Sequence, residues 1–179
     1  KRVFIMDDCK ELLPEYLRFI RGVVDSEDLS LNISRELLQQ NRQIQRMRKG
    51  LVSKVLSTLQ DLREKEGEDY LKFWTQFGRV LREGLFQDHE NRELLLDLML
   101  FQSTQDPKEL TTLKDYVERM PPEQETIYYM TGPSRQSIES SPHLEAFREK
   151  GYEVLILSEP VDEVWTQSIF EYDGKRIES

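Results

Sequence analysis

The hydrophobic pattern changes its period at Pro121 and Pro122, and this change constrains the fold more than any other feature of the chain. Across residues 36–120 the apolar side chains recur at helical spacing. Residues 126–130 and 153–157 are instead short apolar runs of the kind found in buried strands. Because consecutive prolines end a helix, the sequence predicts a helical region followed by a region that contains strands.

The last third of the chain is predicted to form a small αβα subdomain. Two strands, at 126–130 and 153–157, are separated by a helical stretch over 134–150, which we expect to be interrupted at Pro142 and to end at Gly151. Strands joined in this way run parallel, with a right-handed crossover. A helix over 161–169 and a turn at Asp173-Gly174 complete the subdomain.

The central region is predicted to be a helical bundle with two apolar stripes. Gly50 and Gly67 are plausible breaks between its helices, and Thr112 with Asp115 resembles a capping box. Residues 94–101 are apolar enough to be largely buried. One stripe consists of Val52, Val55, Leu56, Leu59 and Leu62, and the other of Tyr70, Phe73, Trp74, Phe77, Val80 and Leu81.

The first residues predict a strand at 3–6, followed by apolar residues at helical spacing over 12–20 that end at Gly22. We expect this strand to be an unguarded edge that pairs with another molecule or stays disordered. The whole chain is therefore predicted to be an α-rich α/β protein in three parts, residues 1–34, 35–122 and 123–179.

An arginine stands where a helix is predicted to begin. Ser34 is a good N-cap, which places Arg35 at the first helical position, where the helix dipole mildly disfavours a cation. Gln39 follows four residues later and so shares its face. With the free amides of the first turn, these side chains form a donor-rich patch suited to a phosphate. The alternative is a surface arginine paired with a nearby acid.

The composition limits the classes of partner. A net charge of −9 argues against nucleic acid, although Arg42, Arg46, Arg48 and Lys49 form a local basic set that is either a solvated helix face or an extension of a positive field near Arg35. The single cysteine, Cys9, favours a reducing compartment. Neither a signal peptide nor a membrane span is recognisable, so we expect a soluble, cytoplasmic protein.

Several enzyme signatures are missing from the sequence. His89 and His143 stand far apart without a cysteine partner, so no metal site is expected. No glycine-rich nucleotide loop occurs. The segment 132–134 could bind a phosphate, but an ordinary strand-to-helix turn capped by Ser134 explains it better.

Residues 22–40, which end in LNISRELLQQ, closely resemble the catalytic loop of heat-shock protein 90 chaperones. Further segments resemble the middle domain of that family, in the same order: residues 116–120, 127–132, 141–145 and 150–155. The resemblance covers almost the whole chain, and the residues around 123–165 are most similar to the bacterial branch. It implies that the strand at 3–6 belongs to a larger αβα subdomain that is truncated here.

The resemblance also implies a role for the arginine. Arg35 would reach the γ-phosphate of ATP, which with Mg²⁺ is held by a separate N-terminal domain, and Gln39 would support it. The fragment alone is then expected to be inactive. The implied partners are the N-terminal ATPase domain, a C-terminal dimerisation domain that makes the parent a homodimer, cochaperones, and unfolded or partly folded client proteins.

Two questions stay open in the sequence. Glu163, Trp165 and Ile169, next to Phe170, combine acid with large apolar groups and are candidates for client binding, but Trp165 could equally close the core of the small subdomain. The alternative function is a nucleotide-independent interaction scaffold, in which Arg35 pairs with an acidic partner.

Overall fold

The computed structural model describes Phe4, residues 7–27 and residues 42–179. The chain divides into two compact units, one up to Leu71 and one from Lys72 onward. Helices and a mixed sheet together confirm the predicted α/β class. The three-part division at residues 34/35 and 122/123 stays a prediction. The strand predicted at 3–6 lies outside the described residues except for Phe4, which is not in a strand.

In the first unit, the helix expected over residues 12–20 is wrong. Only a short 3₁₀ helix, η1 (Glu15–Leu17), forms there, with Pro14 as its N-cap. Proline disfavours the helical conformation of the residue before it, so a helix cannot run through Leu13. The apolar spacing instead reflects burial, since Tyr16 and Leu17 are completely buried.

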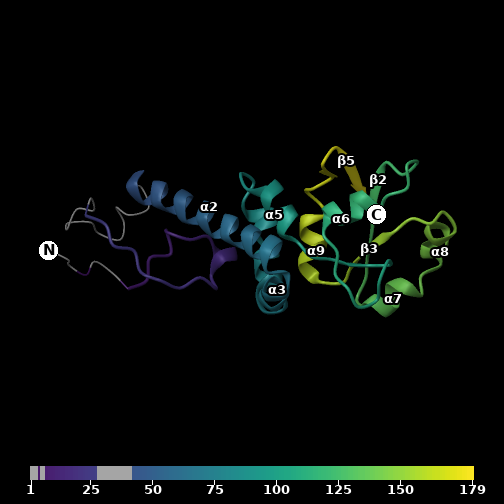
Figure 1. The fold of residues 1–179 in the computed structure, drawn as a ribbon, viewed down its shortest axis with the longest axis horizontal. Helices are drawn as coiled ribbons and strands as arrows, with labels where there is room; N and C mark the ends of the chain where they lie inside the picture. Colours follow the sequence, from purple (N-terminus) through teal and green to yellow (C-terminus); the bar gives the residue numbers. More distant parts are fainter. Residues whose placement is uncertain (1–3, 5–6, 28–41) are drawn as a thin grey trace. The chain divides into compact units, whose positions relative to one another are not determined.

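The long helix of this unit is α2 (Arg42–Lys65) (Figure 1). Its buried side chains are Ile44, Val52, Leu56 and Leu59, which lie at helical spacing and confirm most of the first predicted stripe. Gly50 lies inside this helix and does not break it. Gly67, in contrast, begins the next helix, α3 (Gly67–Arg82), as expected.

The aromatic stripe on α3 is core, as its spacing indicated. Trp74 and Leu81 are buried, and Gly78 lets the helix backbone lie against the Trp74 ring. Three shorter helices follow in the second unit: α4 (Gly84–Gln87), α5 (Arg92–Leu98) and α6 (Leu113–Arg119). The predicted cap of α6 is confirmed, because the Thr112 hydroxyl accepts a hydrogen bond from the Asp115 amide at 3.0 Å.

The expectation that residues 36–120 are helical throughout is wrong between α5 and α6. There the chain forms a short strand, β1 (Gln102–Ser103), and Phe101 pairs with Thr111 through two backbone hydrogen bonds of 2.8 Å. Leucine and phenylalanine suit buried strands as well as helices, so spacing alone could not separate the two. Residues 94–101 are nevertheless largely buried, as predicted.

The second unit is built on a five-stranded sheet with the order β1-β3-β2-β5-β4. Figure 1 labels β2, β3 and β5 of this sheet. The predicted strands are β2 (Thr126–Thr131) and β3 (Val154–Leu157), and they are parallel, with Tyr129 opposite Leu155. All four residues of β3 are buried, as in a central parallel strand. The terminal hairpin, β4 (Glu171–Tyr172) and β5 (Lys175–Glu178), turns at Asp173-Gly174 as predicted, and both turn residues have positive φ.

The helices that connect these strands follow the predicted interruption at Pro142. They are α7 (Arg135–Glu139), capped by Ser134, and α8 (Pro142–Glu149), capped by Ser141. Gly151 ends the second of them with a φ of 69°. The last helix, α9 (Pro160–Trp165), is shorter than the predicted 161–169. At its end the Thr166 hydroxyl donates to the Asp162 carbonyl at 2.7 Å, a local bond that competes with further helix.

Candidate functional site

The candidate catalytic residues Arg35 and Gln39 lie outside the described residues, so their role stays a prediction. The basic set just after them is described, at the start of α2. Arg42, Arg46 and Lys49 are exposed, and their spacing of four and three residues places them on one face of the helix. Arg48 instead donates from Nη1 to the Glu11 carbonyl at 3.0 Å. Three cations of the set therefore face solvent, and the fourth helps to hold the first unit together.

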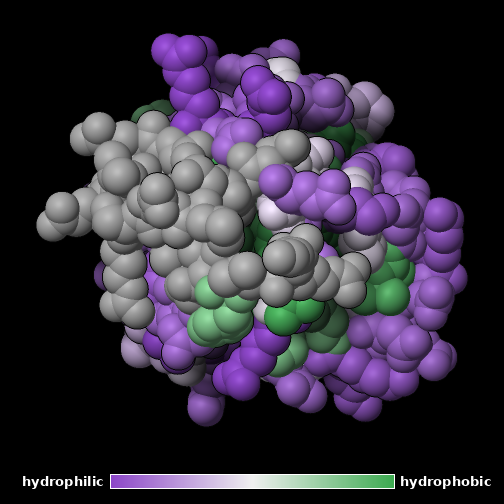
Figure 2. All heavy atoms as spheres, turned by 90° about the vertical axis from the view of Figure 1, so that its left-hand side faces the viewer, coloured by the Kyte–Doolittle hydropathy of each residue, from purple (hydrophilic) through white to green (hydrophobic). Residues whose placement is uncertain are grey.

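The molecular face in Figure 2 is mostly hydrophilic where its atoms are coloured, with a smaller group of hydrophobic residues.

Cys9, in the first unit, is half-buried. Burial raises the pKa of its thiol, and a hydrogen bond from the thiol to Glu11 acts in the same direction. A thiol with a raised pKa is a poor nucleophile at neutral pH, which supports a structural role.

Two of the three candidate client-binding residues are buried. Trp165 is 0 % exposed and Ile169 is 3 % exposed, which removes the partial exposure on which their candidacy depended. Only Glu163 is exposed. The indole of Trp165 packs against Phe101, with ring centroids 5.9 Å apart, and its Nε1 donates to Asp162 Oδ1 at 2.9 Å. Trp165 thus closes the core of the second unit, the other interpretation that the sequence left open.

The exposed apolar side chains of this segment are Val164, at 47 %, and Phe170, at 63 %. The sequence contained a signal for this arrangement. Val161, Trp165 and Ile169 recur every four residues, which is the spacing of a buried helix face, whereas Val164 falls outside that series. Glu163, Val164 and Phe170, which are each exposed, replace the predicted set as the candidates for protein contact.

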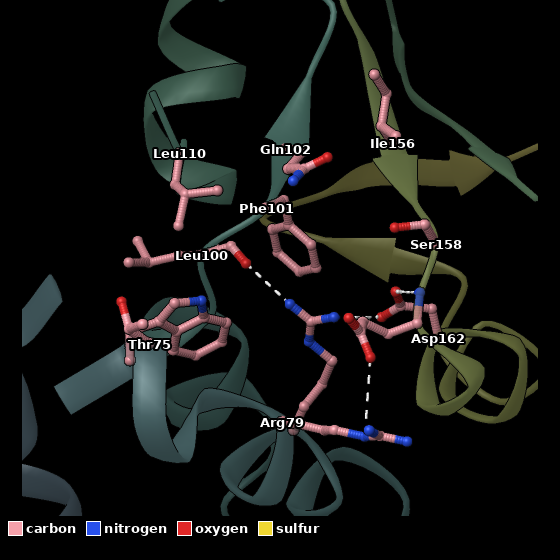
Figure 3. Close-up of a pocket in the computed structure, with 12 residues that line it drawn as sticks. Thr75, Arg79, Leu100, Phe101, Gln102, Leu110, Ile156, Ser158 and Asp162 are labelled. Carbon is pink, nitrogen blue, oxygen red and sulfur yellow. Dashed lines mark hydrogen bonds and ion pairs between the residues drawn. The ribbon is translucent and has the colours of Figure 1, made fainter. Parts of the chain in front are cut away.

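A buried ion pair connects α3 with α9 (Figure 3). Arg82 Nη1 lies 2.8 Å from Asp162 Oδ1, and Arg82 Nη2 donates to the Leu100 carbonyl at 3.0 Å. The guanidinium also lies 5.3 Å from the ring centroid of Trp74 and 5.4 Å from that of Phe101. Sequence reasoning missed this pair, because its members are 80 positions apart and neither belongs to a local motif.

A cavity of about 260 Å³ adjoins this ion pair, at the carboxyl end of β3. Its apolar lining includes Trp74, Phe101 and Ile156. At its polar side, Arg79 Nε lies 3.7 Å from Glu159 Oε2, and both side chains are substantially exposed. Such a mixture of aromatic surface and charged groups can bind a small molecule or a side chain.

The phosphate, metal and membrane sites considered from the sequence find no support among the described residues. Ser134, in the segment 132–134, accepts a hydrogen bond from the Ser137 amide at 3.2 Å, as expected for an ordinary helix cap. Within residues 7–27 and 42–179, no group of three or more His, Cys, Asp and Glu side chains is arranged to hold a metal ion. None of the helices in the same ranges has the length and apolar character needed to cross a membrane.

Comparison with known proteins places the chain in a family. The family model described as Hsp90 protein matches residues 1–179. Among relatives, a protein of Nocardia farcinica named chaperone protein HtpG is 63 % identical over 180 residues. Proteins of the same name from Mycobacterium ulcerans and Mycobacterium tuberculosis are 60 % and 59 % identical over 179 residues.

Each of these matches covers the whole of this chain but only 28 % of the relative. The chain therefore corresponds to one segment of a larger chaperone. The resemblance found in residues 22–40 and in the later segments is confirmed at the level of the family. This chain belongs to the Hsp90 protein family.

Proposed function

We propose that this chain is the middle segment of an ATP-dependent chaperone and that Arg35, supported by Gln39, completes the ATPase site of a separate N-terminal domain. The observation that carries the proposal is the family match over all 179 residues, which includes the loop LNISRELLQQ. The matched region is 28 % of the relative's own length, which leaves room for the other domains that the proposal needs.

The chemistry of the arginine supports this assignment. Hydrolysis of ATP spreads negative charge over the γ-phosphate oxygens, and a guanidinium directed at that charge raises the rate by about 10³–10⁵ in well-studied NTPases. Arginine stays charged and donates in a plane, which suits phosphate oxygens. In this proposal ATP is the substrate and Mg²⁺ remains with the nucleotide domain, so this chain supplies only hydrogen-bond donors and positive charge.

The described basic face of α2 adds to that charge. Arg42, Arg46 and Lys49 are exposed within fourteen positions of Arg35 in a chain whose net charge is −9. A cluster of like charges raises the local potential over roughly one Debye length, about 8–10 Å at physiological ionic strength. The face therefore favours approach to a nucleotide-bearing surface.

The test is Arg35→Ala in the whole parent protein. Turnover of ATP is expected to fall at least about tenfold while the nucleotide dissociation constant changes little, because the arginine acts on charge that develops during the reaction. Arg148→Ala, which removes an exposed arginine of α8 outside the basic set, is the matched control and is expected to leave the turnover unchanged. Turnover within twofold of the wild type in Arg35→Ala would exclude the residue from the mechanism.

For client binding, the exposed surface of Glu163, Val164 and Phe170 is the site we propose. Apolar side chains that are 47 % and 63 % exposed next to a carboxylate offer adaptable contact with partly folded chains. Replacing Val164 and Phe170 with serine in the whole parent is expected to weaken binding of an unfolded model protein without lowering the stability of the fold. Leu71→Ser, at an equally exposed leucine, is the control. Equal binding by both variants would remove this surface from the proposal.

A further inference from the structure

The cavity beside Arg82 has no part in the proposed ATPase or client-binding roles, and its chemistry is specific enough to suggest a ligand. We propose that it binds a small carboxylate that carries an aromatic or branched aliphatic group. At about 260 Å³ it is below the roughly 300–1,000 Å³ of sites for drug-sized molecules, so a single ring with a short acid chain suits it.

The apolar part of the ligand has a defined surface to contact. Trp74 and Phe101 are 8 % and 1 % exposed and present aromatic surface to the cavity, and Ile156 adds aliphatic surface from β3. Figure 3 shows Phe101, Gln102 and Leu110 around the same space, with Ser158 and Asp162 on the α9 side. A ring placed there loses contact with water on several sides, which favours binding.

The inner polar groups are hydrogen-bonded to one another. Both oxygens of the Asp162 carboxylate are used: Oδ1 accepts from Arg82 Nη1 and from Trp165 Nε1, and Oδ2 accepts from the Glu159 amide at 3.2 Å. The carbonyl of Leu100 accepts from Arg82 Nη2. Arg82 Nε, in contrast, is buried and has no hydrogen-bond partner within the described ranges. Its burial keeps it from a ligand in the cavity, so the donor that a ligand carboxylate can reach is the exposed guanidinium of Arg79.

The outer polar group is the guanidinium of Arg79, whose side chain is 68 % exposed. Its Nε stands 3.7 Å from Glu159 Oε2, which is longer than a hydrogen bond, and an exposed ion pair of this kind is weak. Arg79 can therefore exchange Glu159 for the carboxylate of a ligand and bind it with two parallel N–H donors. Glu159 competes with the ligand carboxylate for Arg79. A cationic ligand would be repelled by Arg79 and Arg82.

The experiment is an NMR titration of the ¹⁵N-labelled 179-residue chain with phenylacetate, phenylacetamide and benzylamine, which are anionic, neutral and cationic ligands of similar size. The signals to follow are the indole N–H of Trp74 and the backbone amide of Ser158. Phenylacetate is expected to shift both signals saturably and to bind about tenfold more tightly than the amide, as a charge-assisted hydrogen bond allows. Equal binding of all three ligands, or no saturable shift with phenylacetate, would overturn the proposal.

Three substitutions sharpen the test. Arg79→Gln is expected to weaken phenylacetate about tenfold and to leave phenylacetamide unchanged, whereas Glu159→Gln is expected to tighten phenylacetate because the competing acid is removed. Arg176→Gln is the matched control, because Arg176 forms an equally exposed pair with Glu178 at 3.8 Å. An Arg79→Gln variant that binds phenylacetate like the wild type would contradict the assignment. Since the readout is binding, failure here is separate from failure of the ATPase proposal.

Discussion

Replacing Asp162 with alanine is expected to destabilise the second unit by about 3–5 kcal/mol, the usual cost of removing one partner of a buried ion pair. The Asp162 side chain is 1 % exposed, and that of Arg82 is 9 % exposed. Without the carboxylate, the guanidinium keeps its hydrogen bond to the Leu100 carbonyl but loses the negative charge of Asp162. Trp165 Nε1 and the Glu159 amide lose their acceptor in the same step.

A double substitution separates the cost of the unpaired charge from the loss of hydrogen bonds. Arg82→Met combined with Asp162→Ala removes both charges, and methionine still fills apolar space between Trp74 and Phe101. The double variant is expected to be more stable than Asp162→Ala alone, although still less stable than the wild type. The interaction energy from the full double-mutant cycle is expected to be about 1–3 kcal/mol.

Tryptophan fluorescence during urea unfolding is the assay, because Trp74 and Trp165 are the only two tryptophans and both lie in the second unit. Glu178→Ala is the control, since it breaks an exposed pair with Arg176 and is expected to change stability by no more than about 0.5 kcal/mol. A stability of Asp162→Ala within about 1 kcal/mol of the wild type, or a further loss of stability on adding Arg82→Met, would show that the buried pair does not stabilise the unit in this way.

Two further predictions concern packing and pH. Gly78→Ala is expected to destabilise the second unit by about 1–3 kcal/mol despite the better helix propensity of alanine, because the new Cβ would lie 2.5 Å from the Trp74 ring. Gly50→Ala in α2 is expected to stabilise the first unit by up to about 1 kcal/mol, because among the described residues the new Cβ would meet nothing within 4 Å beyond its own stretch of helix. Thermal unfolding measures both, and the same sign of change in the two variants would contradict the packing argument. Burial raises the pKa of Tyr116 from 10.0 to about 12. The unfolded chain therefore loses this proton at lower pH than the folded chain does. The contribution of Tyr116 to stability is intact below pH 10.0 and declines as the pH rises to about 12. Urea midpoints measured across that range are expected to fall less steeply in Tyr116→Phe than in the wild type, and parallel pH profiles would show that Tyr116 does not contribute.

Local sequence signals predicted the βαβ part of the fold well. The strands β2 and β3 follow from short apolar runs in the sequence. The break between α7 and α8 at Pro142 and the helix end at Gly151 each depend on a residue whose backbone permits few alternatives. The cap of α6 could be predicted as well, because the Thr112 hydroxyl accepts a hydrogen bond from an amide only three residues away. Where structure is set by neighbours in sequence, a single sequence is informative.

Errors occurred where distant contacts decide the structure. β1 exists because Gln102 pairs with Ile156 across the sheet, and no pattern in its own neighbourhood distinguishes it from a helix. Trp165 is buried because its ring packs against Phe101 and its indole N–H donates to Asp162, whereas the neighbouring Val164 is exposed. The Arg82–Asp162 pair and the cavity beside it involve residues far apart in the chain, so neither could be predicted before the fold was known.

The central claim is that this chain supplies an arginine to a nucleotide site on another domain. Its most direct test is ATP hydrolysis by the isolated N-terminal domain of the parent protein, measured with increasing amounts of the 179-residue chain. The expected result is stimulation that saturates, that is abolished by Arg35→Ala and that is unchanged by Arg148→Ala. Hydrolysis that stays at its basal rate at saturating amounts of the chain, or equal stimulation by Arg35→Ala, would contradict it.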